Sequence, residues 1–256
     1  MADRNFDDLA DRFKRKVYSA SKGDIRQDIL KRDYQEFLPL YDREKELNIF
    51  DAGGGLGQTA CYFASLGHQV LLCDISKKML SLASEAINEQ QLSNKVTLLN
   101  QTIEKVTDEN KEAFDLLSCH AVLEWVDDPL KIIEACLNSV KPEGFLSLTY
   151  YNVHGLVYKN LLRTNFKRLK TESWQGASGS LTPTGPLQPE IVNRWMDSLG
   201  VNVICESGIR VFHDYILDAK DRARDMNSLK EMEIRYSRKN PFKHLGRYIH
   251  LLVQKQ

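Results

Sequence analysis

The sequence lacks any long apolar run. Its first eight residues, Met-Ala-Asp-Arg-Asn-Phe-Asp-Asp, are charged from the third position, whereas a signal peptide needs an apolar stretch there and a membrane span needs about 18 consecutive apolar residues. Internal repeats and low-complexity tracts are also missing. Hydrophobic and charged residues make up 42% and 27% of the 256 residues, which is typical of a globular domain. We therefore expect a single cytoplasmic domain over residues 1–256.

Cysteine is scarce and shows no pairing pattern. The five cysteines are odd in number and widely spaced, and none forms a Cys-x-x-Cys motif, so we expect buried reduced thiols. The six histidines show no ligand spacing with acids or cysteines, and we expect no metal site. The net charge is zero, because 35 Lys and Arg balance 35 Asp and Glu. Any contact with a polyanion must therefore use a local basic patch.

Short apolar runs alternate with helical patterns in the central part of the chain, which predicts a parallel sheet with crossover helices. We expect a Rossmann-like, doubly wound α/β fold with seven strands, the last of them antiparallel. The expected strands are 47–51, 68–74, 95–99, 114–119, 144–150, 201–215 and 246–253, and the expected helices are 58–66, 76–90, 129–140, 189–199 and 216–238.

Two further segments flank this pattern. Residues 1–46 carry apolar side chains at spacings of three and four, which predicts an amphipathic helical lid; they are Phe6, Leu9, Phe13 and Val17. Residues 152–189 are rich in glycine and proline, which predicts an insertion after the fifth strand rather than another crossover.

A glycine turn follows the first strand. In Gly53-Gly54-Gly55-Leu56-Gly57 the backbone can approach a ligand closely. The spacing differs from the G-x-G-x-x-G of dinucleotide sites and follows an acid, Asp51, which suits a ligand without a pyrophosphate. Asp74 ends the second strand, where a carboxylate accepts the two hydroxyls of a ribose or simply caps the next helix. On the first interpretation, Ile75 and Met79 flank an adenine.

These features resemble the class I S-adenosylmethionine-dependent methyltransferases, as do Phe114-Asp115 and the Lys-Pro-x-Gly turn at 141–144. A longer match resembles the bacterial tRNA 5-carboxymethoxyuridine methyltransferase family. It includes Asp-Arg-Asn-Phe-Asp-Asp at 3–8, Lys-Gly-x-x-Arg at 22–26, His-Ala-Val-Leu-Glu-Trp-Val at 120–126, Tyr-Asn-x-His-Gly at 151–155, Gly-x-Arg-Val-Phe-His-Asp-Tyr at 208–215 and Leu-Gly-Arg-Tyr-Ile-His at 245–250.

The resemblance implies that S-adenosylmethionine is the cofactor and that tRNA, through its anticodon stem-loop, is the partner. The reaction would be methyl esterification of the carboxylate of 5-carboxymethoxyuridine at the wobble position. The donor-binding residues it implies, together with those of the turn, are Arg26, Gly53, Gly54, Gly55, Asp74, Ile75, Met79, Thr102, Ile103 and His120. Two positions depart from the family: Leu56 replaces an acid, and Glu143 replaces a glycine.

Carboxylate methylation needs no catalytic base, because the nucleophile is already ionised at neutral pH. The site must instead exclude water and hold the carboxylate oxygen that does not attack, a task for Arg or Tyr. We expect Tyr151 and Arg210 to do this, although such residues often only brace a cleft wall. The full set of candidates is Tyr151, Asn152, His154, Arg210, His213, Tyr215, Arg247 and Tyr248.

A basic segment follows the fifth strand. Residues 159–170 contain five basic residues and no acid, with an apolar stripe at helical spacing. Lys159, Arg163 and Lys167 are candidates for phosphate contacts beside an anticodon loop, and the alternative is a solvated helix face. Two other functions remain open from the sequence: a methyltransferase acting on a quinone or a small carboxylic acid, and a non-catalytic module that binds S-adenosylmethionine.

Overall fold

A seven-stranded sheet organises the chain in the computed structural model, which describes residues 5, 7, 8, 21–40, 45–172, 174, 182, 183 and 185–256. The strand order is β3-β2-β1-β4-β5-β7-β6. The strands are β1 (Asn48–Ala52), β2 (Gln69–Cys73), β3 (Val96–Leu99), β4 (Phe114–His120), β5 (Val140–Tyr151), β6 (Asn202–Ile209) and β7 (Tyr248–Gln254).

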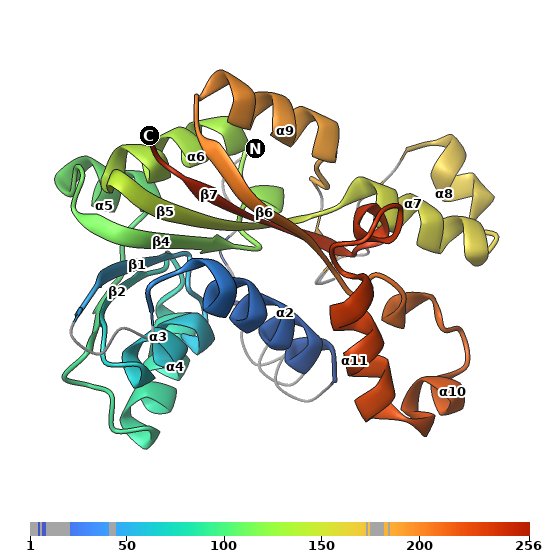
Figure 1. The fold of residues 1–256 in the computed structure, drawn as a ribbon, viewed down its shortest axis with the longest axis horizontal. Helices are drawn as coiled ribbons and strands as arrows, with labels where there is room; N and C mark the ends of the chain where they lie inside the picture. Colours follow the sequence, from blue (N-terminus) through green and yellow to red (C-terminus); the bar gives the residue numbers. More distant parts are fainter. Residues whose placement is uncertain are drawn as a thin grey trace.

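Helices cover both faces of this sheet (Figure 1). The helices are α2 (Ser21–Phe37), α3 (Gln58–Ser65), α4 (Lys77–Glu89), α5 (Ile103–Glu109), α6 (Pro129–Ser139), α7 (Val153–Leu162), α8 (Phe166–Lys170), α9 (Pro189–Ser198), α10 (Ala219–Arg224) and α11 (Met226–Tyr236), with single 3₁₀ turns η1 (Leu123–Trp125), η2 (His213–Tyr215) and η3 (Phe242–Leu245). One apolar core lies under α2, α3 and α4, and a second lies under α5, α6 and α9. The doubly wound arrangement predicted from the sequence is confirmed.

The direction of β7 brings three strand ends to one edge. Strands β1 to β5 run parallel, whereas β7 runs antiparallel to both β5 and β6. Tyr248 at the start of β7 therefore lies opposite Tyr151 at the end of β5 and Ile209 at the end of β6. The antiparallel last strand was predicted, and this edge is where ligands bind in open α/β sheets.

Two predicted elements near the C-terminus were wrong. The predicted strand 201–215 ends at Ile209, because Arg210 has a φ of +60° and the next three backbone N–H groups turn toward Glu233. The predicted helix 216–238 is divided into α10 and α11. Asp225 separates them, and its side chain accepts from the backbone N–H of Ser228 as the N-cap of α11.

The basic segment is also divided, so a single apolar stripe over 159–170 was wrong. Helix α7 ends at Leu162 and α8 begins at Phe166, with Thr164 at a φ of +53° between them. Leu161, Leu162 and Phe166 remain exposed, with Phe166 at 52%. This insertion extends from the side of the body (Figure 1).

The predicted N-terminal lid can be described only in part. Helix α2 packs into the core through Ile25, Ile29, Leu30 and Tyr34. The apolar residues Phe6, Leu9, Phe13 and Val17 lie outside the described residues. Among the helices that are described, none is long and apolar enough to cross a membrane.

Candidate active site

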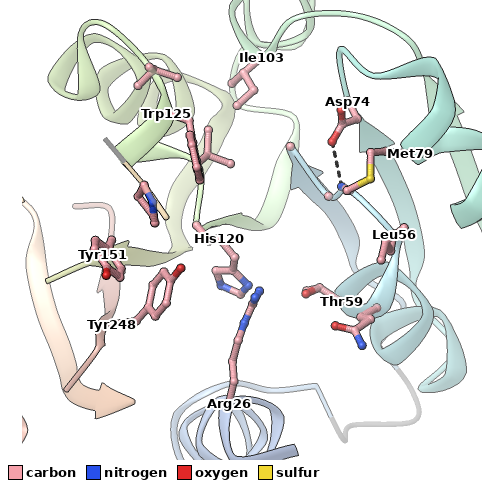
Figure 2. Close-up of a pocket in the computed structure, with 18 of the residues that line it drawn as sticks. Arg26, Leu56, Thr59, Asp74, Met79, Ile103, His120, Trp125, Tyr151 and Tyr248 are labelled. Carbon is pink, nitrogen blue, oxygen red and sulfur yellow. Dashed lines mark hydrogen bonds between the residues drawn. The ribbon is translucent and has the colours of Figure 1, made fainter. Parts of the chain in front are cut away.

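A cavity of about 410 Å³ opens at the edge where β1, β2, β4 and β5 end and β7 begins (Figure 2). One half of its lining comes from the glycine turn, the end of β2 and the start of α5. The other half comes from the ends of β5 and β6, the start of β7 and helix α7. The molecule thus places two chemically different surfaces within one cavity.

The glycine turn forms the floor of the first half. Gly53 has a φ of +66° and Gly55 a φ of +55°, and a β-carbon at Gly53 would lie 2.6 Å from Val122. Side chains are therefore excluded here, which leaves the backbone open to a ligand. The Gly55 N–H donates to Oδ2 of Asp74 over 3.0 Å, as drawn in Figure 2.

Asp74 lies between the start of α4 and the cavity, and its ribose role stays a prediction. Its Oδ1 accepts from the backbone N–H of Ser76, the N-cap of α4, at 2.8 Å, and the residue also lines the cavity. Burial raises the pKa of its carboxyl, and the N–H groups of Ser76 and Gly55 oppose that rise. Each carboxylate oxygen keeps capacity for a further hydrogen bond.

Polar atoms without protein partners gather near the glycine turn. Arg26 points from α2 toward His120 (Figure 2), and its Nε has no hydrogen-bond partner in the described structure. The same holds for Nδ1 of His120 and Oδ2 of Asp51. Arg26 and His120 line the cavity, and because buried polar groups are normally hydrogen-bonded, their two unpaired nitrogens indicate a polar ligand there.

The charge states of these groups follow from their surroundings. Burial, and then Arg26, lowers the pKa of His120 well below its ordinary value, so its ring is neutral. Burial raises the pKa of Asp51 to about 6, although Ser118, which donates to Oδ1 over 2.7 Å, and Arg26 oppose this. Asp51 is therefore mainly ionised at neutral pH.

The opposite wall of the first half is apolar. Ile75 and Met79 line it from the start of α4, and Ile103 lines it from the start of α5. Thr102 is the N-cap of α5, since its side chain accepts from the backbone N–H of Lys105 at 3.3 Å. All the donor-site candidates named from the sequence therefore line one cavity.

The second half is organised around one buried carboxylate. Oδ2 of Asp214 lies 3.2 Å from Nε of Arg247, 3.6 Å from Arg210 and 4.0 Å from Nζ of Lys159. His213 contacts the other oxygen at 3.0 Å. Burial opposes ionisation, but Arg210, His213, Arg247 and Lys159 outweigh it and hold the pKa of Asp214 well below its usual range. Asp214 is therefore an ionised anchor for three cations.

Aromatic rings orient these cations. Arg247 donates to the hydroxyl of Tyr151, and its guanidinium lies 4.9 Å from the centre of that ring. Arg210 lies over Tyr248 at 5.6 Å. Burial, followed by Arg247, lowers the pKa of Lys159 to about 8. Three cations thus compete for one carboxylate, which leaves an excess of positive charge at this end of the cavity.

Several predicted substrate residues do not line the cavity. Asn152 is buried as the N-cap of α7 and donates to the carbonyls of His244 and Gly246. Tyr215 donates to the carbonyl of Leu245, and His213 lies behind Asp214. These residues build the wall that supports the cations.

Three other candidates lie at the surface outside the cavity. His154 is 39% exposed and lies 3.5 Å from Glu190. Arg163 and Lys167 are on the exposed segment of α7 and α8. Groups of three or more His, Cys, Asp or Glu side chains suited to a metal ion do not occur in the described part of the chain.

Sequence reasoning missed some residues that line the cavity. Lys22 and Trp125 stand in motifs that resemble the family, but no role was predicted for them. Thr59 on α3 had no signal at all. The role of Asp214 could not be predicted, because its partners Arg210, Arg247 and Lys159 come from separate segments.

Comparison with known proteins decides the family. The sequence is 38% identical over 255 residues to the tRNA 5-carboxymethoxyuridine methyltransferase of Escherichia coli K12, covering 100% of this chain and 97% of that protein. The chain belongs to the tRNA 5-carboxymethoxyuridine methyltransferase family. A family model described as methyltransferase domain matches residues 50–148. These findings confirm the resemblance, the methyltransferase class and the S-adenosylmethionine cofactor predicted from the sequence.

Other proteins resemble parts of this family member or its fold. The ubiquinone biosynthesis O-methyltransferase of Aliivibrio fischeri is 32% identical over 104 residues, which covers 41% of this chain and 44% of that protein. The crystal structure of magnesium protoporphyrin IX methyltransferase from Synechocystis PCC 6803, solved with bound SAH, has a TM-score of 0.62. At 14% identity over 98% of this chain and 96% of that one, it shows a shared fold.

Proposed function

We propose that this tRNA 5-carboxymethoxyuridine methyltransferase family member uses S-adenosylmethionine to convert the carboxylate of 5-carboxymethoxyuridine, at the tRNA wobble position, into its methyl ester. The observation that carries the proposal is the cluster of Arg210, Arg247 and Lys159 around Asp214, next to a cavity half suited to the donor. An excess of cations fits an anionic substrate group. The glycine turn, in the other half of the same cavity, fits the donor.

The donor half supplies a partner for each part of S-adenosylmethionine. Arg26, which lines the cavity, would pair with the methionine carboxylate, and Asp51, whose Oδ2 lies beside Gly54, would attract the ammonium group. Asp74 would accept the ribose hydroxyls, with the adenine against Ile75 and Met79. In the same proposal, the backbone of Gly53, Gly54, Gly55, Thr102 and Ile103 and the ring of His120 complete the donor site. The bound donor supplies a methyl group activated by a sulfonium.

The protein then needs to position and desolvate rather than to move a proton. The substrate carboxylate is ionised at neutral pH, so it attacks directly. Arg210 and Arg247 would bind the oxygen that does not attack, with the Tyr151 hydroxyl held beside it by Arg247. We assign no proton transfer to His120, because the attacking carboxylate carries no proton to remove and the lowered pKa of the ring makes it a weak base.

The RNA itself would contact α7 and α8. Lys159 lies in the cavity, while Arg163, Lys167 and the exposed Phe166 continue outward along the same segment. A basic surface with an exposed aromatic ring suits phosphates and an unstacked base of an anticodon loop. We further propose that residues 1–256 form one domain, in which α2 braces the donor site, and that the enzyme works in the cytoplasm, where tRNA is modified.

The test is mass spectrometry of nucleosides from tRNA that carries 5-carboxymethoxyuridine but lacks its methyl ester, incubated with the protein and S-adenosylmethionine. A gain of one methyl group on that nucleoside is the expected result. An unchanged nucleoside, from a protein that still binds the donor by calorimetry, would overturn the substrate assignment. In that case small carboxylic acids would be tested next with the same readout, and a lack of any product would favour a binding module.

A further inference from the structure

A chain of buried hydrogen bonds runs from the donor cavity across β4, β5 and β7 to Asp33 on α2. Oδ2 of Asp33 lies 2.7 Å from Nδ1 of His250, whose Nε2 lies 2.9 Å from Oγ of Ser147. The same Ser147 oxygen lies 2.8 Å from Nε2 of His120. The four residues come from α2, β7, β5 and β4 and are all buried. We call this the Asp33–His120 chain.

The outer end of the Asp33–His120 chain is negatively charged. Arg32 and Arg238 both pair with Asp33, at 2.6 and 2.5 Å. Burial alone would raise the pKa of the Asp33 carboxyl, but His250 and the two arginines outweigh it and hold the pKa well below its usual range. An ionised carboxylate needs a donor, so Nδ1 of His250 carries a proton. Since two arginines already balance Asp33, a further positive charge on buried His250 would have no counter-charge.

This end fixes the direction of every following bond. A neutral His250 with a proton on Nδ1 has a lone pair on Nε2, which accepts the single hydroxyl proton of Ser147. The Ser147 oxygen then has only lone pairs left for its other neighbours. It therefore accepts from the hydroxyl of Tyr34, at 2.8 Å, and from Nε2 of His120.

The inner end of the Asp33–His120 chain, at His120, lies beside the cation Arg26 (Figure 2). With its proton on Nε2, His120 has a lone pair on Nδ1, the buried atom that has no partner in the described structure. Arg26 points toward this ring (Figure 2). A guanidinium favours a neighbouring lone pair over a neighbouring N–H, so both ends of the chain select the same arrangement.

We propose that Asp33, His250 and Ser147 are positioning residues that hold His120 as its Nε2–H tautomer, so that Nδ1 serves as a hydrogen-bond acceptor on the Arg26 side of the donor site. The inference rests on the proposed function only in that His120 belongs to the donor site. The tautomer itself is a property of the protein without any ligand.

The experiment is ¹⁵N-histidine NMR on the full chain without ligand, in which long-range couplings identify the protonated ring nitrogen, with His120 assigned through His120→Asn. The wild type is expected to show one Nε2–H form. In Ser147→Ala the remaining partner is the Tyr34 hydroxyl, at 3.2 Å, which accepts or donates equally well, so a mixture of tautomers is expected. Calorimetry should show donor affinity about tenfold lower in this variant, as for one lost hydrogen bond to a charged group.

Ser139→Ala is the matched control, because Ser139 is buried and donates to the carbonyl of Asn110, away from the chain. A wild type with Nδ1–H or doubly protonated His120, or a Ser147→Ala variant that keeps one Nε2–H form, would overturn the inference. Should Ser147→Ala not fold, Asp33→Asn removes the charge at nearly constant volume, and the wild-type tautomer decides in any case. Failure of the wild type to bind the donor, with the Nε2–H form present, would count against the proposed function alone.

Discussion

Glu124 shows how one buried carboxyl affects the stability of the folded state. Burial raises its pKa from 4.5 to about 8, and the backbone N–H groups of Glu124 and Tyr151 reduce that rise only in part. The native state therefore prefers the protonated acid. The stabilisation that this preference gives is complete below pH 4.5 and is lost as the pH rises through about 8.

We expect Glu124→Gln to remove this pH dependence, because glutamine keeps the shape and cannot ionise. The unfolding free energy of the variant minus that of the wild type should rise by on the order of a few kcal/mol from pH 5 to pH 9. Urea unfolding at both pH values measures the difference. Glu89→Gln, at an exposed position of α4, is the control, and an equal difference at the two pH values would contradict the prediction.

Arg210 carries the second residue-level prediction. Its guanidinium lies over Tyr248 and 3.6 Å from Asp214. Lysine keeps the charge but has no planar fork for two parallel hydrogen bonds to a carboxylate. We expect Arg210→Lys to lower kcat/KM for tRNA methylation about 10- to 100-fold while donor affinity stays unchanged.

The measurement pairs nucleoside mass spectrometry with calorimetric titration of the donor. Arg235→Lys, whose side chain lies over Tyr236 on α11, is the matched control and should leave both quantities unchanged. A loss of donor affinity as large as the loss of kcat/KM would show that Arg210 acts elsewhere than on the substrate carboxylate.

At the scale of elements, α11 holds the loop that follows β6. The Glu233 carboxylate accepts from the backbone N–H groups of Val211, Phe212 and His213, at 2.8, 3.1 and 2.6 Å. This loop leads from Arg210 to Asp214. The helix therefore fixes the loop between Arg210 and Asp214 through a carboxylate that accepts from the loop's backbone.

Glu233→Gln should loosen the loop, because the amide nitrogen cannot accept from a backbone N–H. We expect KM for tRNA to rise several-fold and the unfolding free energy to fall by about 1–3 kcal/mol, with donor affinity unchanged. Steady-state kinetics and urea unfolding measure these effects. Glu231→Gln on the same helix is the control, and a variant with unaltered KM would contradict the prediction.

The segment of α7 and α8 is the second element with a testable role. Its cations outside the cavity would contact phosphates, which adds affinity that weakens with salt. Lys167→Ala should lower tRNA affinity and reduce the slope of log K against log salt concentration by about 1, without a change in donor binding. Lys220→Ala on α10 is the control. Equal slopes for Lys167→Ala and the wild type would exclude a phosphate contact.

At the scale of the whole molecule, donor binding should stabilise the fold. A ligand at 100 times its Kd adds about 2.7 kcal/mol to the unfolding free energy. For a chain of this size this corresponds to a rise in Tm of about 5–10 °C. Thermal unfolding with S-adenosylmethionine measures it. Arg26→Ala should shift the response to higher donor concentrations, and an identical dose response would contradict the role of Arg26.

The parallel half of the sheet could be predicted because apolar runs that end in Gly or Asp mark its strands directly. The donor residues followed from the same local signals, together with the resemblance. The second half of the cavity, around Asp214, could not be predicted from such local signals. Arg210 was named but its surroundings were not, because the bend after Ile209 depends on Glu233, which follows 24 positions later. The Asp33–His120 chain depends on a contact across 217 positions, which no local pattern reports.

The place of β7 between β5 and β6 has a consequence for how the protein is made. In the sheet, β6 is hydrogen-bonded only to β7, which follows it in the sequence. While a ribosome has released the chain only as far as β6, both β5 and β6 have an unpaired edge, and such edges favour aggregation. Arg247 and Tyr248, which line the cavity, are also synthesised only with β7. Folding during synthesis can therefore complete the donor half early, whereas the substrate half must wait for the insertion of β7.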